Sequence, residues 1–150
     1  MTGDTMARQR VFGSPTGQCS DWRDVMAETD RARVWRWEDV ELEELAGTIN
    51  RRFVTSDKLM IAQITIPKGN LVPAHRHHNE QITYMITGAL RFLFGEDQDE
   101  EVVVRAGEVL IIPSNLLHSA EALEDTFELD VFNPPRADWI DGSDAYLRGR

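Results

Sequence analysis

The segment Gly69–Gly88 reads GNLVPAHRHHNEQITYMITG and contains three of the chain's four histidines. Pro73 fixes an extended backbone ahead of the first histidine, which favours a strand at this point. Alternate side chains of a strand point to the same face, so His75 and His77 can both approach one ion while Arg76 faces away. The segment therefore predicts a strand that presents two imidazoles to one side of a sheet.

Two further residues complete a candidate metal site. The same alternation places Gln81, and not Glu80, on the face of the histidine pair. His118 follows a proline turn and lies on the next strand that is expected to return to the site. Alternating histidines joined by a third histidine from a later strand are typical of a metal centre. We expect one divalent transition metal ion (Zn, Ni, Mn, Co or Fe) to be bound by His75, His77, Gln81 and His118.

Short segments rich in Val, Ile, Phe and Thr alternate with Gly, Pro and Asn/Asp turns along most of the chain. This spacing is typical of an antiparallel sandwich or barrel, because no long amphipathic helix is present to connect parallel strands. Only residues 40–46 interrupt the pattern, with a short helical periodicity. We therefore predict an all-β jelly roll with strands near residues 34–38, 51–55, 59–66, 81–86, 89–94, 101–104, 108–112 and 126–132.

Residues 1–33 differ in composition from the rest of the chain. They are rich in Gly, Ser, Thr, Asp and Arg and contain one candidate helix near residues 21–33. We expect a partly helical or flexible arm attached to one compact domain, residues 34–150. A chain of 150 residues with 41% hydrophobic side chains can build one core but leaves no room for a second full domain.

The charge of the chain excludes several classes of partner. A net charge of -10, from 16 basic and 26 acidic side chains, repels nucleic acid and anionic membrane surfaces. No apolar run approaches the roughly 20 residues of a membrane span, and the first ten residues are too polar for a secretory signal. Cys19 has no partner for an internal disulfide. We expect a cytoplasmic protein whose partner is a small molecule.

The histidine segment resembles the first motif of the cupin superfamily, and a later segment resembles the second. Gln81 stands where that family usually has Glu, and Asn115 and Ala122 replace a usual Gly and a usual Asn. The resemblance covers about residues 34–136 and implies a small β-barrel, a homodimer, and a metal in the barrel mouth, so that residues 34–150 form a cupin domain. The matching positions are Gly69, His75, His77, Gln81 and Gly88 in the first motif and Gly107, Pro113 and His118 in the second.

The exchange of Glu for Gln81 changes the chemistry expected of the metal. Three neutral imidazoles and a neutral amide oxygen leave the full divalent charge on the ion, which makes it a stronger Lewis acid. The same ligand set gives less support to a trivalent ion and so disfavours iron–oxygen chemistry. We therefore expect redox-neutral catalysis in which the metal polarises a hydroxyl, carbonyl or carboxylate.

A second group of polar residues lies near the end of the predicted barrel. Strand alternation places Glu128, Asp130 and Phe132 on one face, which we expect to line the cavity. There Asp130 can have a raised pKa and transfer protons, unless it lies on a solvated edge strand. Phe132 is a pocket wall or a core aromatic. Arg136, after two prolines, is either a ligand for a substrate carboxylate or a surface ion pair.

Together these residues resemble the small cupins of the pectin degradation protein family, which linearise 4,5-unsaturated monouronates. The resemblance implies that Asp130 is the catalytic carboxylate and that Phe132 and Arg136 contact a sugar acid, with no organic cofactor. We therefore predict a metal-dependent isomerase or lyase acting on a small anionic substrate. Two alternatives remain open: an Fe(II)-dependent cupin dioxygenase, and a non-catalytic cupin that only binds a small molecule.

Overall fold

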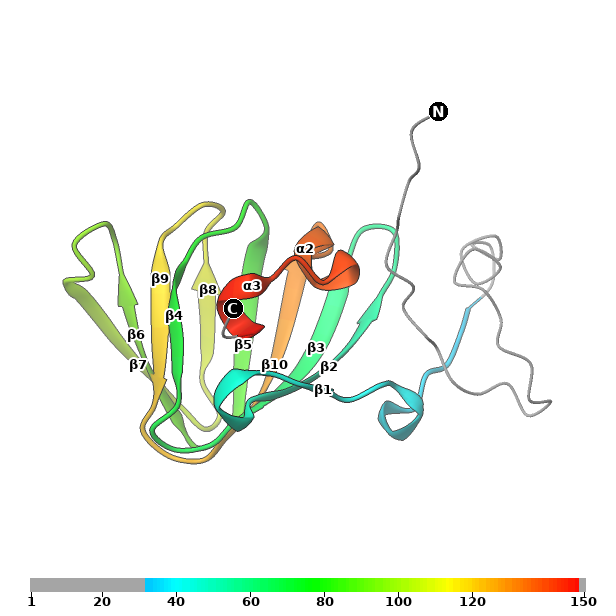
Figure 1. The fold of residues 1–150 in the computed structure, drawn as a ribbon, viewed down its shortest axis with the longest axis horizontal. Helices are drawn as coiled ribbons and strands as arrows, with labels where there is room; N and C mark the ends of the chain where they lie inside the picture. Colours follow the sequence, from blue (N-terminus) through cyan, green and yellow to red (C-terminus); the bar gives the residue numbers. More distant parts are fainter. Residues whose placement is uncertain (1–31, 149–150) are drawn as a thin grey trace.

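The computed structural model of the chain describes residues 32–148, which form two antiparallel sheets (Figure 1). In spatial order, the six-stranded sheet contains β1 (Glu43–Glu44), β2 (Asn50–Thr55), β3 (Met60–Ile66), β10 (Thr126–Asn133), β5 (Glu80–Thr87) and β8 (Val109–Ile112). The four-stranded sheet contains β4 (Leu71–His75), β9 (His118–Ala122), β6 (Ala89–Phe94) and β7 (Glu100–Arg105). The predicted all-β jelly roll is confirmed. The expected arm lies outside the described residues, except for its last two positions.

Within residues 32–148, four short helical segments accompany the strands: η1 (Trp37–Asp39), η2 (Ala46–Thr48), α2 (Ala137–Asp141) and α3 (Ala145–Arg148). The strand expected at residues 34–38 is wrong, because this stretch pairs with neither sheet and ends in the η1 turn. The helix expected at residues 40–46 is also wrong. Seven residues, about two helical turns, are too few for a stable isolated helix. Glu43 and Glu44 of this segment instead form β1, which pairs with β2.

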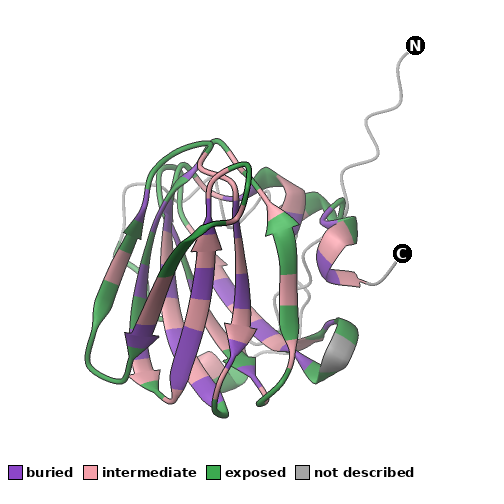
Figure 2. Ribbon diagram, turned by 90° about the vertical axis from the view of Figure 1, so that its left-hand side faces the viewer, coloured by how far each residue is buried: buried purple, intermediate pink, exposed green. Residues whose placement is uncertain are grey.

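Buried apolar residues from both sheets form one core cluster, and Figure 2 shows buried residues alternating with less buried ones along the strands. Burial follows the strand period on β10, whose even-numbered residues from Thr126 to Phe132 are buried and whose odd-numbered residues between them are only half-buried. The face predicted to line the cavity is therefore the inner face. This inner face carries acidic groups at Glu128 and Asp130, although both neighbouring strands contribute apolar residues to the same layer.

Two turns show why particular residues are needed beside the strands. Gly88 has φ +81°, and a Cβ at this position would lie 2.3 Å from the carbonyl oxygen of Asp125. Only glycine fits there, both for its backbone angle and for the close approach of the second chain segment. Asn115, which stands where the cupin motif usually has Gly, also has a positive φ of 63°. Asn is the residue after Gly that best tolerates this conformation, so the turn is retained.

The C-terminal helices close the barrel on one side. α3 contacts β4, and in Figure 1 it lies in front of the strands, between β4 and β5. A buried ion pair holds it there, with Nη1 of Arg51 on β2 lying 2.8 Å from Oδ2 of Asp144. Arg148 binds the same aspartate from within the helix, at 2.6 Å. Among residues 32–148, none of the helices has the length and apolar composition needed to cross a bilayer.

Candidate metal centre

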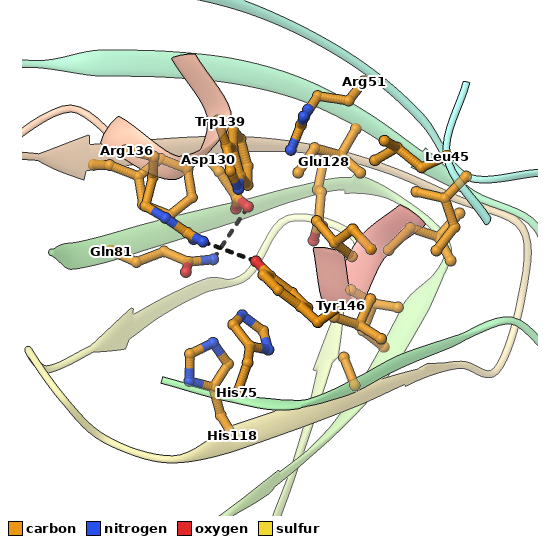
Figure 3. Close-up of a pocket in the computed structure, with 18 of the residues that line it drawn as sticks. Leu45, Arg51, His75, Gln81, His118, Glu128, Asp130, Arg136, Trp139 and Tyr146 are labelled. Carbon is orange, nitrogen blue, oxygen red and sulfur yellow. Dashed lines mark hydrogen bonds between the residues drawn. The ribbon is translucent and has the colours of Figure 1, made fainter. Parts of the chain in front are cut away.

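Three histidines meet at one end of the cavity between the sheets (Figure 3 shows two of them). His75 ends β4 and is the register partner of His118, the first residue of β9. His77 follows β4 in the loop before β5. One nitrogen of each ring lies within 4.8 Å of the corresponding nitrogens of the other two. The predicted convergence of these three side chains is therefore present in the structure.

Each of the three rings is held by a backbone carbonyl. Nδ1 of His75 lies 2.9 Å from the oxygen of Pro73, Nδ1 of His77 lies 2.9 Å from that of Asn79, and Nδ1 of His118 lies 2.8 Å from that of Leu116. A carbonyl only accepts, so each Nδ1 carries the proton and each Nε2 is left with a free lone pair. This is the arrangement by which proteins orient imidazoles as metal ligands.

The surroundings of the three histidines favour the neutral form of each ring. Burial, with a smaller contribution from the neighbouring His118, lowers the pKa of His75 to about 3. Burial also lowers the pKa of His77 to about 4, with a contribution from the charge of Arg136. The pKa of His118 is lowered, again mainly by burial. Neutral imidazoles are required for metal binding, and the packing around these rings keeps them in that form.

Gln81 on β5 directs its amide oxygen at the same place. Its Oε1 lies 3.2 Å from Nε2 of His77, while its Nε2 donates to Oγ1 of Thr83 at 2.9 Å and to Oδ2 of Asp130 at 3.1 Å. With Nδ1 of His77 donating to Asn79, the His77–Gln81 contact joins two acceptors. A cation between them would satisfy both lone pairs, so the residues present fit a metal ion.

Asp130 lies behind Gln81 and is 3% exposed. Burial raises its pKa to about 6, although the hydrogen bonds from Thr83 and Gln81 act in the opposite direction. Glu128, two residues earlier on the same face of β10, is fully buried, and its pKa is raised well above the ordinary value, first by burial and then by the charge of Asp130. The alternative of a solvated edge strand is therefore wrong, since β10 lies in the middle of its sheet.

Phe132 and Arg136 also line the cavity. The Phe132 ring contacts the rings of His77 and Trp139 edge-on, with centroids 5.8 Å and 4.9 Å away, and is both a core residue and a cavity wall. Arg136 is 1% exposed, so it is not a surface residue as the second alternative had it. Its Nε and Nη2 bind the carboxylate of Asp138 at 2.9 Å and 2.6 Å.

Several residues in the cavity or beside it were not predicted from the sequence. Tyr146 on α3 stacks on the ring of His75, with centroids 4.3 Å apart, and its hydroxyl accepts a hydrogen bond from Arg136 at 2.8 Å (Figure 3). A tyrosine so far from the motif carries no local signal of this contact. Thr83 differs, because strand alternation puts it on the face of Gln81, and that pattern could have identified it. Figure 3 shows Leu45 on the far side of the cavity from His75.

Comparison with known proteins agrees with this architecture. Residues 62–133 match the family model of the cupin domain. The structure resembles KdgF from Halomonas sp., with a TM-score of 0.64, 24% identity, and coverage of 71% of this chain and 99% of that one. It also resembles an RmlC-like cupin from Shewanella frigidimarina, with a TM-score of 0.66, 23% identity, and coverage of 73% and 97%. A third similar structure is a predicted oxalate decarboxylase from Thermotoga maritima. It has a TM-score of 0.58 and 22% identity, with coverage of 69% of this chain and 100% of that one. No curated protein sequence matches significantly.

Proposed function

Because residues 62–133 form a cupin domain, we propose that this chain is a metal-dependent enzyme with one divalent ion at the cavity end described above. The observation that carries the proposal is the set of four lone pairs that face one another. Three belong to imidazoles whose Nδ1 atoms are held by backbone carbonyls, and the fourth is the Gln81 oxygen. The proposed ligands are His75, His77, Gln81 and His118.

The proposed reaction is a redox-neutral isomerisation or lyase step. All four ligands are neutral, so a bound divalent ion would retain its charge and supply Lewis-acid polarisation of a substrate oxygen. Asp130 lines the same cavity and is the proposed acid–base group, because its carboxylate is buried beside the ligand Gln81. Thr83 donates to the other carboxylate oxygen at 2.6 Å and fixes the direction of that group.

We propose a small carboxylate as the substrate, with 4,5-unsaturated uronates as the first candidates. The predicted role of Arg136 needs refinement here, since its Nε and Nη2 are already paired with Asp138. The guanidinium is thus neutralised, and the uncompensated charge of the metal becomes the main attraction for an anion. Tyr146 places an aromatic face and a hydroxyl beside His75, where a ring-shaped substrate could pack.

The test is an assay of the purified full-length protein with unsaturated galacturonate, followed by the loss of ultraviolet absorbance. We expect decay that depends on added divalent metal, that is lost in His77→Ala, and that falls by about 10² to 10⁴ in Asp130→Asn at saturating metal. Arg76→Ala is the matched control, because Arg76 pairs with the exposed Glu96 and faces away from the site. A decay no faster than without enzyme rules out this substrate.

The two alternatives are outcomes of further measurements on the same preparation. Oxygen consumption coupled to a substrate, with iron as the bound metal, would replace the isomerase with a dioxygenase. Tight binding of a small molecule without turnover, unchanged by Asp130→Asn, would indicate a non-catalytic binding protein. A cytoplasmic location stays a prediction.

The proposed partner on the protein surface is a second copy of the chain. The outer face of the six-stranded sheet carries a row of apolar side chains paired across β3, β10, β5 and β8: Ile61, Val131, Ile82 and Ile111. Ile61, Ile82 and Ile111 are 36%, 40% and 59% exposed. For a chain with a net charge of -10, this uncharged row is where two copies can meet without repulsion.

Sedimentation of the full-length protein tests this pairing. Ile82→Lys places a charge in the middle of the row, and we expect it to convert a dimer into a monomer. Leu71→Lys is the control, because Leu71 is 64% exposed but lies on β4 of the other sheet. A monomeric wild-type protein, or equal effects of both substitutions, would contradict the proposal.

A further inference from the structure

The amide of Gln81 has two ends, and only one of them can bind a metal. Oxygen is a ligand, whereas the NH₂ group is a donor without an available lone pair. A glutamate at this position would offer two equivalent oxygens and have no wrong orientation. The Gln81 ligand therefore needs something that decides which end faces the histidines, and this question rests on the metal-dependent function proposed above.

The neighbours of Gln81 supply that decision. Its Nε2 lies 3.1 Å from Oδ2 of Asp130 and 2.9 Å from Oγ1 of Thr83, and the Thr83 hydroxyl itself donates to Oδ1 of Asp130 at 2.6 Å. Since the Thr83 hydroxyl donates its one hydrogen to Asp130, it can only accept a hydrogen bond from Gln81. An ionised carboxylate likewise only accepts. Thr83 and Asp130 therefore both require the NH₂ group of the Gln81 amide to point toward them.

The reverse orientation of the amide is costly in this enclosure. It would bring Oε1 of Gln81 against Oδ2 of Asp130, two acceptors in contact, and would leave Oγ1 of Thr83 without a donor. All three side chains are buried, at 7%, 3% and 0% exposed, so water cannot easily replace the lost hydrogen bonds. At the other end, Nε2 of Gln81 would face Nε2 of His77 and occupy its lone pair.

The geometry assigns Asp130 and Thr83 a second role, as positioning residues that hold the Gln81 oxygen toward the metal. The cupin motif usually has a Glu at the position of Gln81, so that a carboxylate is itself a ligand. Here the carboxylate of Asp130 is instead hydrogen-bonded to the proposed ligand Gln81. The metal keeps neutral ligands, while the charge-assisted hydrogen bond from the amide to Asp130 makes the Gln81 oxygen a better electron donor. This role is separate from proton transfer and is measured by metal affinity.

The substitution Asp130→Asn tests it, because an amide offers one acceptor where the carboxylate offers two. Either the Gln81 amide reverses its orientation, or the Thr83 hydroxyl loses its acceptor. The same substitution has a different meaning beside Gln81→Glu, since a carboxylate ligand has no orientation to lose. There Asp130→Asn instead removes a contact between two carboxylates and supplies a donor to the new ligand.

The experiment measures the affinity of Co(II) for the metal-free full-length protein, by calorimetry and by visible absorption, in the four combinations of these two substitutions. We expect Asp130→Asn to weaken binding by about tenfold or more beside Gln81. Beside Gln81→Glu we expect it to leave affinity unchanged or to raise it. A role of Asp130 as a negative charge alone predicts similar losses in both backgrounds, and that result would overturn the assignment. So would the absence of a loss beside Gln81.

Two control variants, together with the binding of Co(II) by the wild-type protein, separate this inference from its alternatives. Glu128→Gln changes another buried carboxyl group on the same face of β10, and we expect it to leave Co(II) affinity unchanged. Thr83→Val removes the hydroxyl with little change of shape, and we expect it to weaken binding in the Gln81 background, with circular dichroism and thermal unfolding reporting whether each variant folds. If the wild-type protein binds no Co(II), the proposed function fails. If it binds and Asp130→Asn has no effect, only the positioning role fails.

Discussion

Replacing Asp144 should destabilise the protein strongly, because this residue holds the C-terminal helix to the barrel through Arg51. The Arg51 and Asp144 side chains are both 0% exposed. The guanidinium also binds Glu43 through Nε at 2.8 Å and lies over the ring of Trp139, with its carbon 4.1 Å from the centroid. Removing one partner of a buried pair leaves a charge without compensation and costs roughly 3–5 kcal/mol.

The structure places the Asp144→Ala substitution at the lower end of that range. Glu43 remains as a partner for Arg51, and it is itself 26% exposed, so the cation is not left fully unpaired. We therefore expect a loss of about 3 kcal/mol in the free energy of unfolding, which for a chain of this length lowers the melting temperature by roughly 6–12 °C. α3 should separate from β4 at the same time, because Arg148 also depends on Asp144.

Chemical denaturation followed by circular dichroism measures the loss, with Glu96→Ala as the matched control. Glu96 forms an ion pair with Arg76, but the two side chains are 73% and 47% exposed, so its removal should cost no more than about 0.5 kcal/mol. Fluorescence of Trp139, which packs beneath the Arg51 guanidinium, reports the local change. Equal stability of the two variants would refute the reasoning and show that Glu43 alone compensates Arg51.

Two further predictions concern the barrel itself. Gly88→Ala should lower the free energy of unfolding by at least about 1–2 kcal/mol because of its positive φ, and by more because of the contact with the Asp125 oxygen. Gly69→Ala has φ +83° but no atom within 4 Å of the added Cβ, so it should show only the backbone cost. Urea unfolding compares them, and equal losses would contradict the close contact. Burial raises the pKa of Glu128 in the folded state, so above the ordinary pKa of Glu the folded wild-type protein binds more protons than the unfolded one. The stability of the wild-type protein therefore falls as pH rises. Glu128→Gln removes this dependence, so its stability relative to the wild type should increase with pH. Denaturation series at several pH values test this, and a constant difference between the two proteins would disprove it.

Local patterns in the sequence were sufficient for the fold class and for identifying three histidines that converge in the structure. Strand alternation placed Asp130 on the inner face, because the period of a strand is a property of the backbone alone. The same alternation cannot run from His75 on β4 to Gln81 on β5, which lie in different sheets, so the convergence of these two residues depends on the fold. Turn residues marked the strand ends for the same reason, as Gly88 shows with its positive φ. The segment 40–46 was misread, since its conformation depends on pairing with β2 and not on its own periodicity.

Only the tertiary structure decided how the site is completed. The sequence places no constraint on the distance between Tyr146 and His75, which the fold brings into ring contact. It identified Arg136 but not its pairing with Asp138, and it identified Gln81 but not the direction of its amide. The Tyr146–His75 ring contact joins residues distant in the chain, and the direction of the Gln81 amide comes from its hydrogen bond to Asp130 on another strand, between buried side chains. The sequence by itself thus determined which residues of β10 face inward, because that depends on local backbone geometry. Packing determined which atoms of those residues remain free to bind a metal, because that depends on neighbours brought together by the fold.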